Sequence, residues 1–197
     1  MVKRRKMGVL GGTFDPIHMG HLVLAEQLRE ELKLDEVLFI PCCKPPHKTR
    51  RLLSPAKDRF QITKLAIDDN PYFSISDIEL KREGLSYTVD TLRELKRSDP
   101  KSEIYFLIGS DVLSEITTWK DPEQIYNLVK VVIARRPGFD KFDPEDDFVK
   151  KSIMVHITGM DLSSTQIREK VRKGKSIKYL VPRRVEEYIE RKRLYRG

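Results

Sequence analysis

Hydrophobic and polar residues follow two alternating patterns along this chain. Short unbroken or nearly unbroken apolar runs are typical of buried strands, and they occur at residues 6–10, 36–40, 104–108, 129–134 and 153–156. Between and after these runs, apolar residues recur at the spacing of one helix face, which predicts helices over residues 18–32, 55–69, 88–97, 122–128, 163–172 and 182–194. Residues 72–80 are expected to be extended. Ser54 is expected to cap the helix that Pro55 begins.

This order of elements indicates the fold class. Strands that are apolar on both faces and alternate with helices are typical of a parallel sheet covered by helices. The length of 197 residues suits one domain. We therefore expect an α/β protein with a Rossmann-like, doubly wound parallel sheet, helices on both faces and a small C-terminal helical region from about residue 163. In such sheets, ligands bind beyond the carboxyl ends of the strands.

Composition and charge narrow the classes of protein. Apolar residues make up 39% of the chain, which is too much for a disordered chain, and the longest apolar run, residues 104–108, is far shorter than a membrane helix. The net charge of +8 is concentrated in residues 1–6, with four basic residues, and residues 168–197, with twelve Lys or Arg against four Glu. Basic ends fit a nucleic-acid binder, a site for a small anion, or a solvated helix.

The cysteines indicate the compartment. Cys42 and Cys43 are adjacent in sequence, and disulfide geometry disfavours a bridge between neighbours. Two cysteines without a second spaced pair also do not make a zinc site. The N-terminus lacks the apolar stretch of a signal peptide, so a reducing cytoplasm is the expected location.

The segment GGTFDPIHMGHL, residues 11–22, joins the first predicted strand to the first predicted helix. Gly11 and Gly12 allow an anion to approach the backbone closely, and the start of a helix offers free N–H groups and a positive dipole end. His18 and His21 share one face of the first turn. The dipole favours neutral imidazoles there, and a neutral ring still donates a hydrogen bond to a phosphate. Asp15 has two open interpretations, a helix cap and a substrate contact.

A second candidate anion site is the segment SSTQIR, residues 163–168. Ser163 and Gln166 have the spacing of a capping box, which is a purely structural interpretation. The three hydroxyls of Ser163, Ser164 and Thr165 also cluster at a helix start, and Arg168 follows one turn later. This cluster favours a phosphate site.

The first segment resembles the signature of the HxGH nucleotidyltransferases, and its Gly-Gly-Thr-Phe-Asp-Pro-Ile-His form resembles that of the bacterial nicotinate-nucleotide adenylyltransferase family. The resemblance continues in PPHK (45–48), GLSYTVDTL (84–92), GSD (109–111) with a later Trp, RRPG (135–138) and SSTQIR. It implies adenylyl transfer from ATP to nicotinate mononucleotide in NAD biosynthesis, by one nucleotidyltransferase domain over residues 1–197 whose C-terminal helices complete the ATP phosphate site.

The resemblance also implies a role for each matching residue. His18 and His21 would contact the ATP phosphates and stabilise the charge of the transition state. The remaining ATP contacts would be Gly11, Gly12, Thr13, Phe14, Gly109, Asp111, Ser163, Ser164, Thr165 and Arg168. The mononucleotide would contact Lys48, Tyr87, Thr88, Trp119 and Arg136, with Arg135 as an alternative to Arg136. Trp119 would stack on the pyridine ring, although a lone Trp is also common in cores.

Other partners and rival functions stay open at this stage. ATP chemistry implies Mg²⁺ carried on the phosphates, and we see no carboxylate cluster that demands a protein-built metal site. The partners expected are small molecules, with no nucleic acid and no membrane, and the oligomeric state is not readable. The rivals are phosphopantetheine and glycerol-phosphate nucleotidylyltransferases, an enzyme that prefers nicotinamide, and an RNA-binding module.

Overall fold

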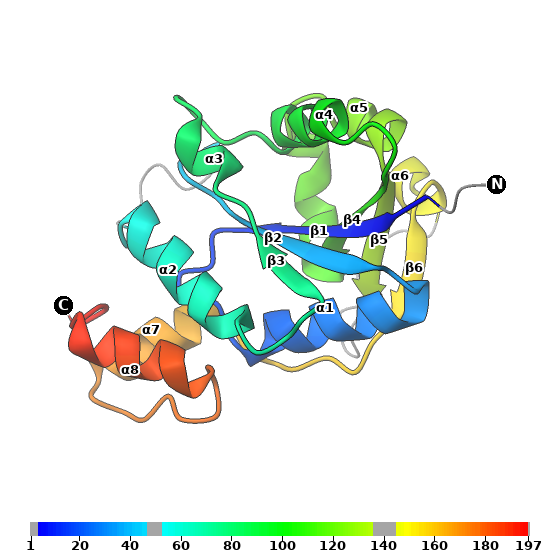
Figure 1. Cartoon of the computed structure of the whole chain (residues 1–197). Helices are drawn as coiled ribbons and strands as arrows, with labels where there is room; N and C mark the ends of the chain where they lie inside the picture. Colours follow the sequence, from blue (N-terminus) through cyan, green and yellow to red (C-terminus); the bar gives the residue numbers. More distant parts are fainter. Residues whose placement is uncertain (1–3, 47–52, 136–144, 197) are drawn as a thin grey trace.

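The computed structural model describes residues 4–46, 53–135 and 145–196, and a six-stranded sheet forms its centre (Figure 1). The strand order is β3-β2-β1-β4-β5-β6, and every neighbouring pair is parallel. This order reverses direction at β1, as in the doubly wound dinucleotide-binding folds. The strands are β1 (Lys6–Gly12), β2 (Glu36–Pro41), β3 (Phe73–Ile75), β4 (Glu103–Gly109), β5 (Lys130–Arg135) and β6 (Ile153–His156).

Helices cover both faces of this sheet, which confirms the expected fold class. One face packs on α4, α5 and the 3₁₀ helix η2, and the other packs on α1, α2, α7 and α8. Their bounds are α1 (Met19–Leu32), α2 (Ala56–Ile67), α3 (Ile78–Lys81), α4 (Thr88–Ser98), η2 (Ser110–Thr118), α5 (Pro122–Leu128), α6 (Asp147–Lys150), α7 (Ser164–Arg172) and α8 (Arg183–Arg191). Among the described residues, none of these helices has the length and apolarity needed to cross a membrane.

Apolar residues explain why the central strands are buried on both faces. In β4, the five residues from Ile104 to Ile108 are all buried, and they alternate between the two hydrophobic clusters. Tyr105 and Leu107 face the cluster with α1 and α2, whereas Ile104, Phe106 and Ile108 face the cluster with α4 and α5. This alternation is the period of two expected of a strand between two helical layers.

The structure corrects several local expectations. Residues 72–80 are not one extended segment, because only Phe73–Ile75 form a strand and Ile78–Lys81 form a short helix. Pro55 is the N-cap of α2 and not its first residue, so Ser54 does not cap this helix. The helix expected over 182–194 ends at Arg191, because the chain turns through a left-handed conformation at Arg193 (φ 51°). Neither η2 nor α6 was expected.

Candidate active site

The glycine turn leaves the central strand of the sheet and leads into α1. Gly11 and Gly12 are the last two residues of β1. Phe14 then adopts a left-handed conformation (φ 48°), which places its buried ring over Gly12. A Cβ atom at Gly12 would come within 2.7 Å of that ring, so glycine is required there by the close approach of the ring.

The two histidines of the HxGH motif form a stacked pair at the start of α1. His18 is the N-cap residue and His21 is the third residue of the helix. Their ring centroids lie 3.8 Å apart with 31° between the planes, and the His18 backbone N–H donates to His21 Nδ1 at 3.3 Å. His18 is buried, His21 is half-buried, and the Phe14 ring meets the His21 ring edge-on at 5.2 Å. The predicted sharing of one helix face is therefore confirmed.

Gly20 provides the space for the first imidazole. A Cβ atom at this position would lie 3.1 Å from His18 Nδ1 and 3.2 Å from His18 Cε1. These distances are shorter than ordinary van der Waals contact, so any side chain here would displace the imidazole. The glycine of the motif therefore leaves the space that the His18 ring occupies.

Asp15 is not the cap of α1, because His18 occupies that position. Asp15 is instead buried, with 3% of its surface exposed, and its Oδ1 accepts a hydrogen bond from the Tyr195 hydroxyl at 2.9 Å. Its Oδ2 is buried without a hydrogen-bond partner among the described residues. The carboxylate thus connects the turn after β1 to the far end of the sequence.

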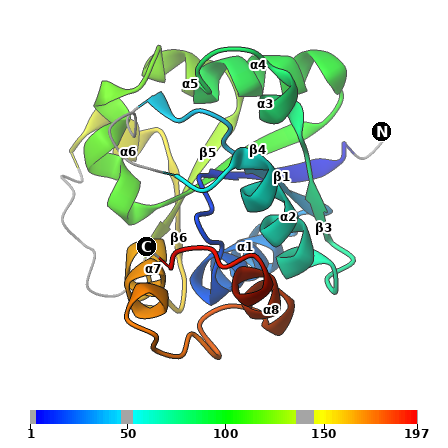
Figure 2. The same ribbon diagram turned by 90° about the vertical axis from the view of Figure 1, so that its left-hand side faces the viewer.

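The start of α7 lies against the same turn (Figure 2). Ser163 caps the helix in the capping box that its spacing with Gln166 indicated as the structural alternative, with reciprocal hydrogen bonds at 3.2 and 2.8 Å. The Ser164 hydroxyl donates to the Pro16 carbonyl at 2.8 Å, and Arg168 donates both to the Asp15 carbonyl and to Thr165 Oγ1. The two predicted anion sites are therefore adjacent, at the N-termini of two helices.

The neighbouring strand brings the next candidates to the same edge of the sheet. Val9 of β1 pairs with Phe106 of β4, so Gly12 and Gly109 occupy equivalent places three residues further along. Asp111 follows in the first turn of η2 and is exposed. Gly109 and Asp111 therefore lie at the point where the strand order reverses, which is where a nucleotide binds in folds of this kind.

A third group of candidates gathers around the start of α4. Tyr87 is the N-cap residue of α4 and Thr88 its first residue. Trp119 follows η2, is half-buried, and meets the Phe106 ring edge-on at 6.1 Å. Its neighbour Lys120 lies 4.8 Å from the centre of the Tyr87 ring, so the two segments are in contact. Lys48 and Arg136 lie outside the described residues.

Arg59 of α2 is a residue whose importance the sequence did not show. It is 1% exposed, and its guanidinium donates to the carbonyls of Thr13, Cys42, Cys43 and Ser54 at 2.5 to 3.0 Å. It therefore holds together the loop after β1 and the loop after β2. A lone Arg in an amphipathic helix usually lies on the exposed face, and no local pattern distinguished this one.

The Cys42 thiol differs in its surroundings from an activated cysteine. Burial raises the pKa of Cys42 to about 12, with a further contribution from the nearby Glu79 carboxylate. A thiol with so high a pKa carries almost no thiolate at neutral pH. Cys42 is therefore not placed to act as a nucleophile.

The model of the cytidylyltransferase-like family matches residues 9–170, and the chain belongs to this family. Relatives from Desulfitobacterium hafniense (strain Y51) and Thermoanaerobacter sp. (strain X514) are 42% and 43% identical to it. The alignments cover 98% and 100% of this chain and 96% and 97% of the relatives. Both are named probable nicotinate-nucleotide adenylyltransferases, and within the wider family the chain belongs with these enzymes.

Solved structures share the fold. The nicotinic acid mononucleotide adenylyltransferase of Plasmodium falciparum, in complex with NaAD, superposes with a TM-score of 0.82 at 22% identity, and 97% of each chain is covered. A second structure of that protein, in complex with APC, has a TM-score of 0.79 with the same identity and coverage. At this level of identity the likeness establishes the architecture.

Proposed function

We propose that this protein transfers the adenylyl group of ATP to nicotinate mononucleotide, forming deamido-NAD and releasing pyrophosphate in NAD biosynthesis. The observation that carries the proposal is the meeting of two helix N-termini at the carboxyl end of β1. One of them bears the stacked pair of His18 and His21, and the other bears the hydroxyls of α7. The names of the relatives support the choice of substrates.

The reaction needs positioning and charge stabilisation more than acid–base catalysis. A 5′-phosphate oxygen of the mononucleotide attacks the α-phosphorus of ATP, and the bond from this phosphorus to the oxygen that bridges to the β-phosphate breaks. The electron pair leaves with pyrophosphate. Because the attacking oxygen is already an anion, no general base is required. We assign to His18 and His21 the donation of ring N–H bonds to the phosphates as negative charge accumulates.

The other ATP contacts follow from the same edge of the sheet. The backbone of Gly11, Gly12, Thr13 and Phe14 would line the nucleotide, with Gly109 and Asp111 at the ribose. We assign the β- and γ-phosphates to the start of α7. Because the C-terminal helices would then complete the ATP site, we infer that they belong to one domain spanning residues 1–197.

The hydrogen bonds at the start of α7 show which of its three hydroxyls can still donate to a phosphate. Ser164 has used its proton on the Pro16 carbonyl. Ser163 and Thr165 accept hydrogen bonds in the contacts described above, so each keeps a proton for a phosphate oxygen. Arg168 would add positive charge while it holds the Asp15 carbonyl.

For the mononucleotide, we propose that Trp119 stacks on the pyridine ring. We propose that the nicotinate carboxylate binds at the N-terminus of α4, beside Tyr87 and Thr88. A helix N-terminus favours a negative charge, which offers a reason to prefer the acid over the amide. Lys48 and Arg136 stay our candidates for the mononucleotide phosphate on the strength of the family motifs alone.

Magnesium would enter as a complex with ATP. The described residues contain no group of three or more His, Cys, Asp and Glu side chains placed to hold an ion, whereas phosphate oxygens and water are ordinary Mg²⁺ ligands. When bound, the ion neutralises charge on the phosphates. We also infer a cytoplasmic location, in keeping with ATP as co-substrate and with the free thiols of Cys42 and Cys43.

The deciding experiment mixes the protein with Mg-ATP and either nicotinate or nicotinamide mononucleotide, and measures pyrophosphate. Release with the acid and much less with the amide is expected. No release with the acid would refute the proposal, and faster release with the amide would reassign the substrate. Because RNA binding weakens steeply with salt, a salt titration of RNA binding and of turnover separates the enzyme from an RNA-binding module.

The histidines are tested by substitution. His18→Ala and His21→Ala should each lower kcat by about two orders of magnitude or more, the range of a lost transition-state donor. Circular dichroism and thermal unfolding check that the variants fold. Unchanged turnover in both folded variants would contradict the mechanism.

A further inference from the structure

The turn that carries His18 is held by hydrogen bonds to residues in the C-terminal region, between Ser164 and Tyr195. Ser164 and Arg168 of α7 bond the carbonyls of Pro16 and Asp15. The Met19 backbone N–H, at the start of α1, donates to the Leu180 carbonyl at 2.9 Å. The Tyr195 hydroxyl reaches the Asp15 carboxylate. Of these contacts, the one from Tyr195 spans the greatest distance in sequence and comes from beyond the last helix.

The chain makes an unusual path to bring Tyr195 to this place. After α8, both Arg193 (φ 51°) and Tyr195 (φ 64°) adopt left-handed conformations, which favour glycine and are uncommon for other residues. The Leu194 backbone N–H bonds back to the Ile189 carbonyl at 3.0 Å. Leu194 and Tyr195 then pack against the core cluster that contains Phe14 and Ile17.

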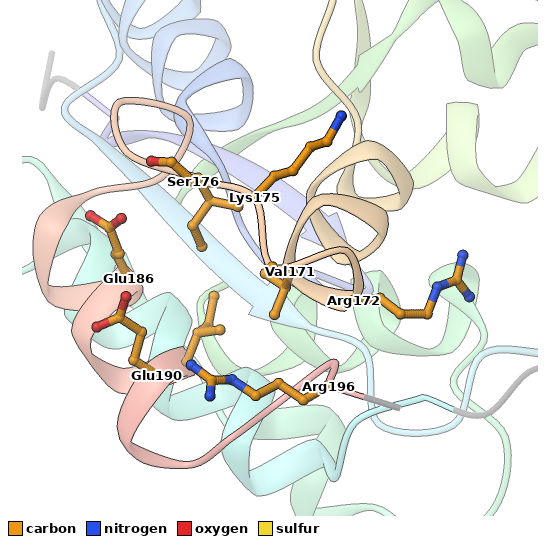
Figure 3. Close-up of a pocket in the computed structure, with 10 residues that line it drawn as sticks. Val171, Arg172, Lys175, Ser176, Glu186, Glu190 and Arg196 are labelled. Carbon is orange, nitrogen blue, oxygen red and sulfur yellow. The ribbon is translucent and has the colours of Figure 1, made fainter.

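One side of this segment borders a cavity. A cavity of about 550 Å³ lies between the end of α7, the loop that follows and α8. Its lining includes the apolar side chains of Val171 and Ile189. Arg196, which follows Tyr195 in sequence, also lines it (Figure 3). The chain therefore passes a hollow on one side, and Tyr195 anchors it on the other.

The hydrogen bond between Tyr195 and Asp15 is costly to break, because the carboxylate that accepts it is buried. Asp15 is buried, and only one of its two carboxylate oxygens has a partner among the described residues. Removing the phenol hydroxyl would leave both oxygens of this buried carboxylate without a donor among the described residues, which is costly in a buried site. Burial, followed by the Asp15 charge, raises the pKa of Tyr195 well above its usual value, so the phenol stays a donor at every ordinary assay pH.

We propose that Tyr195 is a positioning residue for adenylyl transfer, which acts through Asp15 to hold the turn that presents His18 and His21 to the phosphates. This proposal rests on the proposed function. His18 follows Asp15 by three residues. Once the Tyr195 hydroxyl is lost, the side-chain hydrogen bonds described for the backbone of Asp15 and Pro16 are those of Arg168 and Ser164. A shift of the imidazole by a fraction of an ångström is enough to weaken a transition-state hydrogen bond.

Tyr188 offers a matched control. Its hydroxyl donates to Asp58 Oδ1 at 2.7 Å, so it too joins the C-terminal region to a carboxylate. This carboxylate lies on α2 and not on the catalytic turn, residues 13–18. Tyr195→Phe and Tyr188→Phe each remove one hydroxyl and preserve the ring. A purely structural role for both tyrosines would give equal effects.

The experiment measures kcat, both KM values and thermal unfolding for the two variants. Tyr195→Phe is expected to lower kcat about tenfold and to leave KM for nicotinate mononucleotide within twofold, because Trp119 and α4 are not touched. Tyr188→Phe is expected to keep kcat within twofold at a comparable loss of thermal stability. An unchanged kcat in Tyr195→Phe, or an equal loss in both variants, overturns the proposal.

A double-mutant cycle identifies the path. In the Asp15→Ala background, adding Tyr195→Phe should change kcat by less than twofold, because the group through which Tyr195 acts is already absent. A full tenfold loss in that background would show that Tyr195 acts by another route. If Asp15→Ala does not fold, the comparison of the two phenylalanine variants still decides. An inactive wild-type protein would refute the proposed function itself, a result distinct from any of these.

Discussion

Replacing Arg59 with Met tests whether one buried guanidinium holds together the loop after β1 and the loop after β2. The substitution keeps most of the side-chain volume and removes the charge and four hydrogen bonds, to the carbonyls of Thr13, Cys42, Cys43 and Ser54. A buried acceptor left without a partner costs about 1–3 kcal/mol. Because these carbonyls are only partly buried, the lower end applies, and four of them give about 4 kcal/mol.

Part of that loss is recovered, since the variant no longer takes a charge out of water. We therefore expect Arg59→Met to lower the free energy of unfolding by about 3 kcal/mol, a large share of the ~5–15 kcal/mol typical of such domains. Urea titration followed by circular dichroism measures this difference. Arg59→Lys keeps the charge but not the planar fork, and its loss should be intermediate.

The control is Arg184→Met. Arg184 forms an ion pair with Asp68 between α8 and α2, and both side chains are about half exposed. Exposed pairs contribute about 0–1 kcal/mol, so this variant should stay within 1 kcal/mol of the wild type. A loss below 1 kcal/mol for Arg59→Met, or equal losses for the two arginine variants, would refute the reasoning.

Three further outcomes follow from the geometry. Gly20→Ala should lower kcat at least tenfold with little change in stability, because the new Cβ would lie 3.1 Å from His18 Nδ1; kinetics with unfolding curves check it, and wild-type kcat would contradict it. Trp119→Ala should raise KM for nicotinate mononucleotide far more than KM for ATP, since stacking on the pyridine ring is lost, and equal changes would argue against the stacking. Burial and the bonded Asp58 raise the pKa of Tyr188 to about 12, from about 10 in the unfolded chain. Stability should therefore fall as pH rises from 10 to 12, and less so in Tyr188→Phe, which urea titrations at each pH would measure; parallel pH profiles would contradict the assignment.

The sequence predicted the sheet well because its strands carry a signal that tertiary contacts reinforce. Apolar runs such as residues 104–108 are buried on both faces, so composition alone marks them. The starts of α1 and α7 were predicted to within one residue, at the N-cap residues His18 and Ser163, since a capping residue and a polar-to-apolar transition lie within a few residues of each other. Elements of three or four residues, such as β3 and α3, lack the length over which periodicity is visible, and residues 72–80 were therefore misjudged.

The candidate site was predictable only where its residues lie in a local motif. His18, His21 and the hydroxyls of α7 belong to such motifs, and the structure brings them together. Arg59 and Tyr195 act through partners 46 and 180 residues away, and no local pattern in the chain encodes such pairs. Asp15 shows the same limit: next to a helix start it resembled a cap, and its true partner is Tyr195.

The contact between Asp15 and Tyr195 has a consequence for how the protein matures. The catalytic turn is translated early, whereas the side chain that secures it is added 180 residues later. During synthesis the first strands can pair before the turn after β1 has its hydrogen bond from Tyr195. A growing chain would therefore lack full catalytic activity until Tyr195 leaves the ribosome. Contacts of such long sequence separation also slow folding, so competence should be acquired last, as a final fastening of a sheet already assembled.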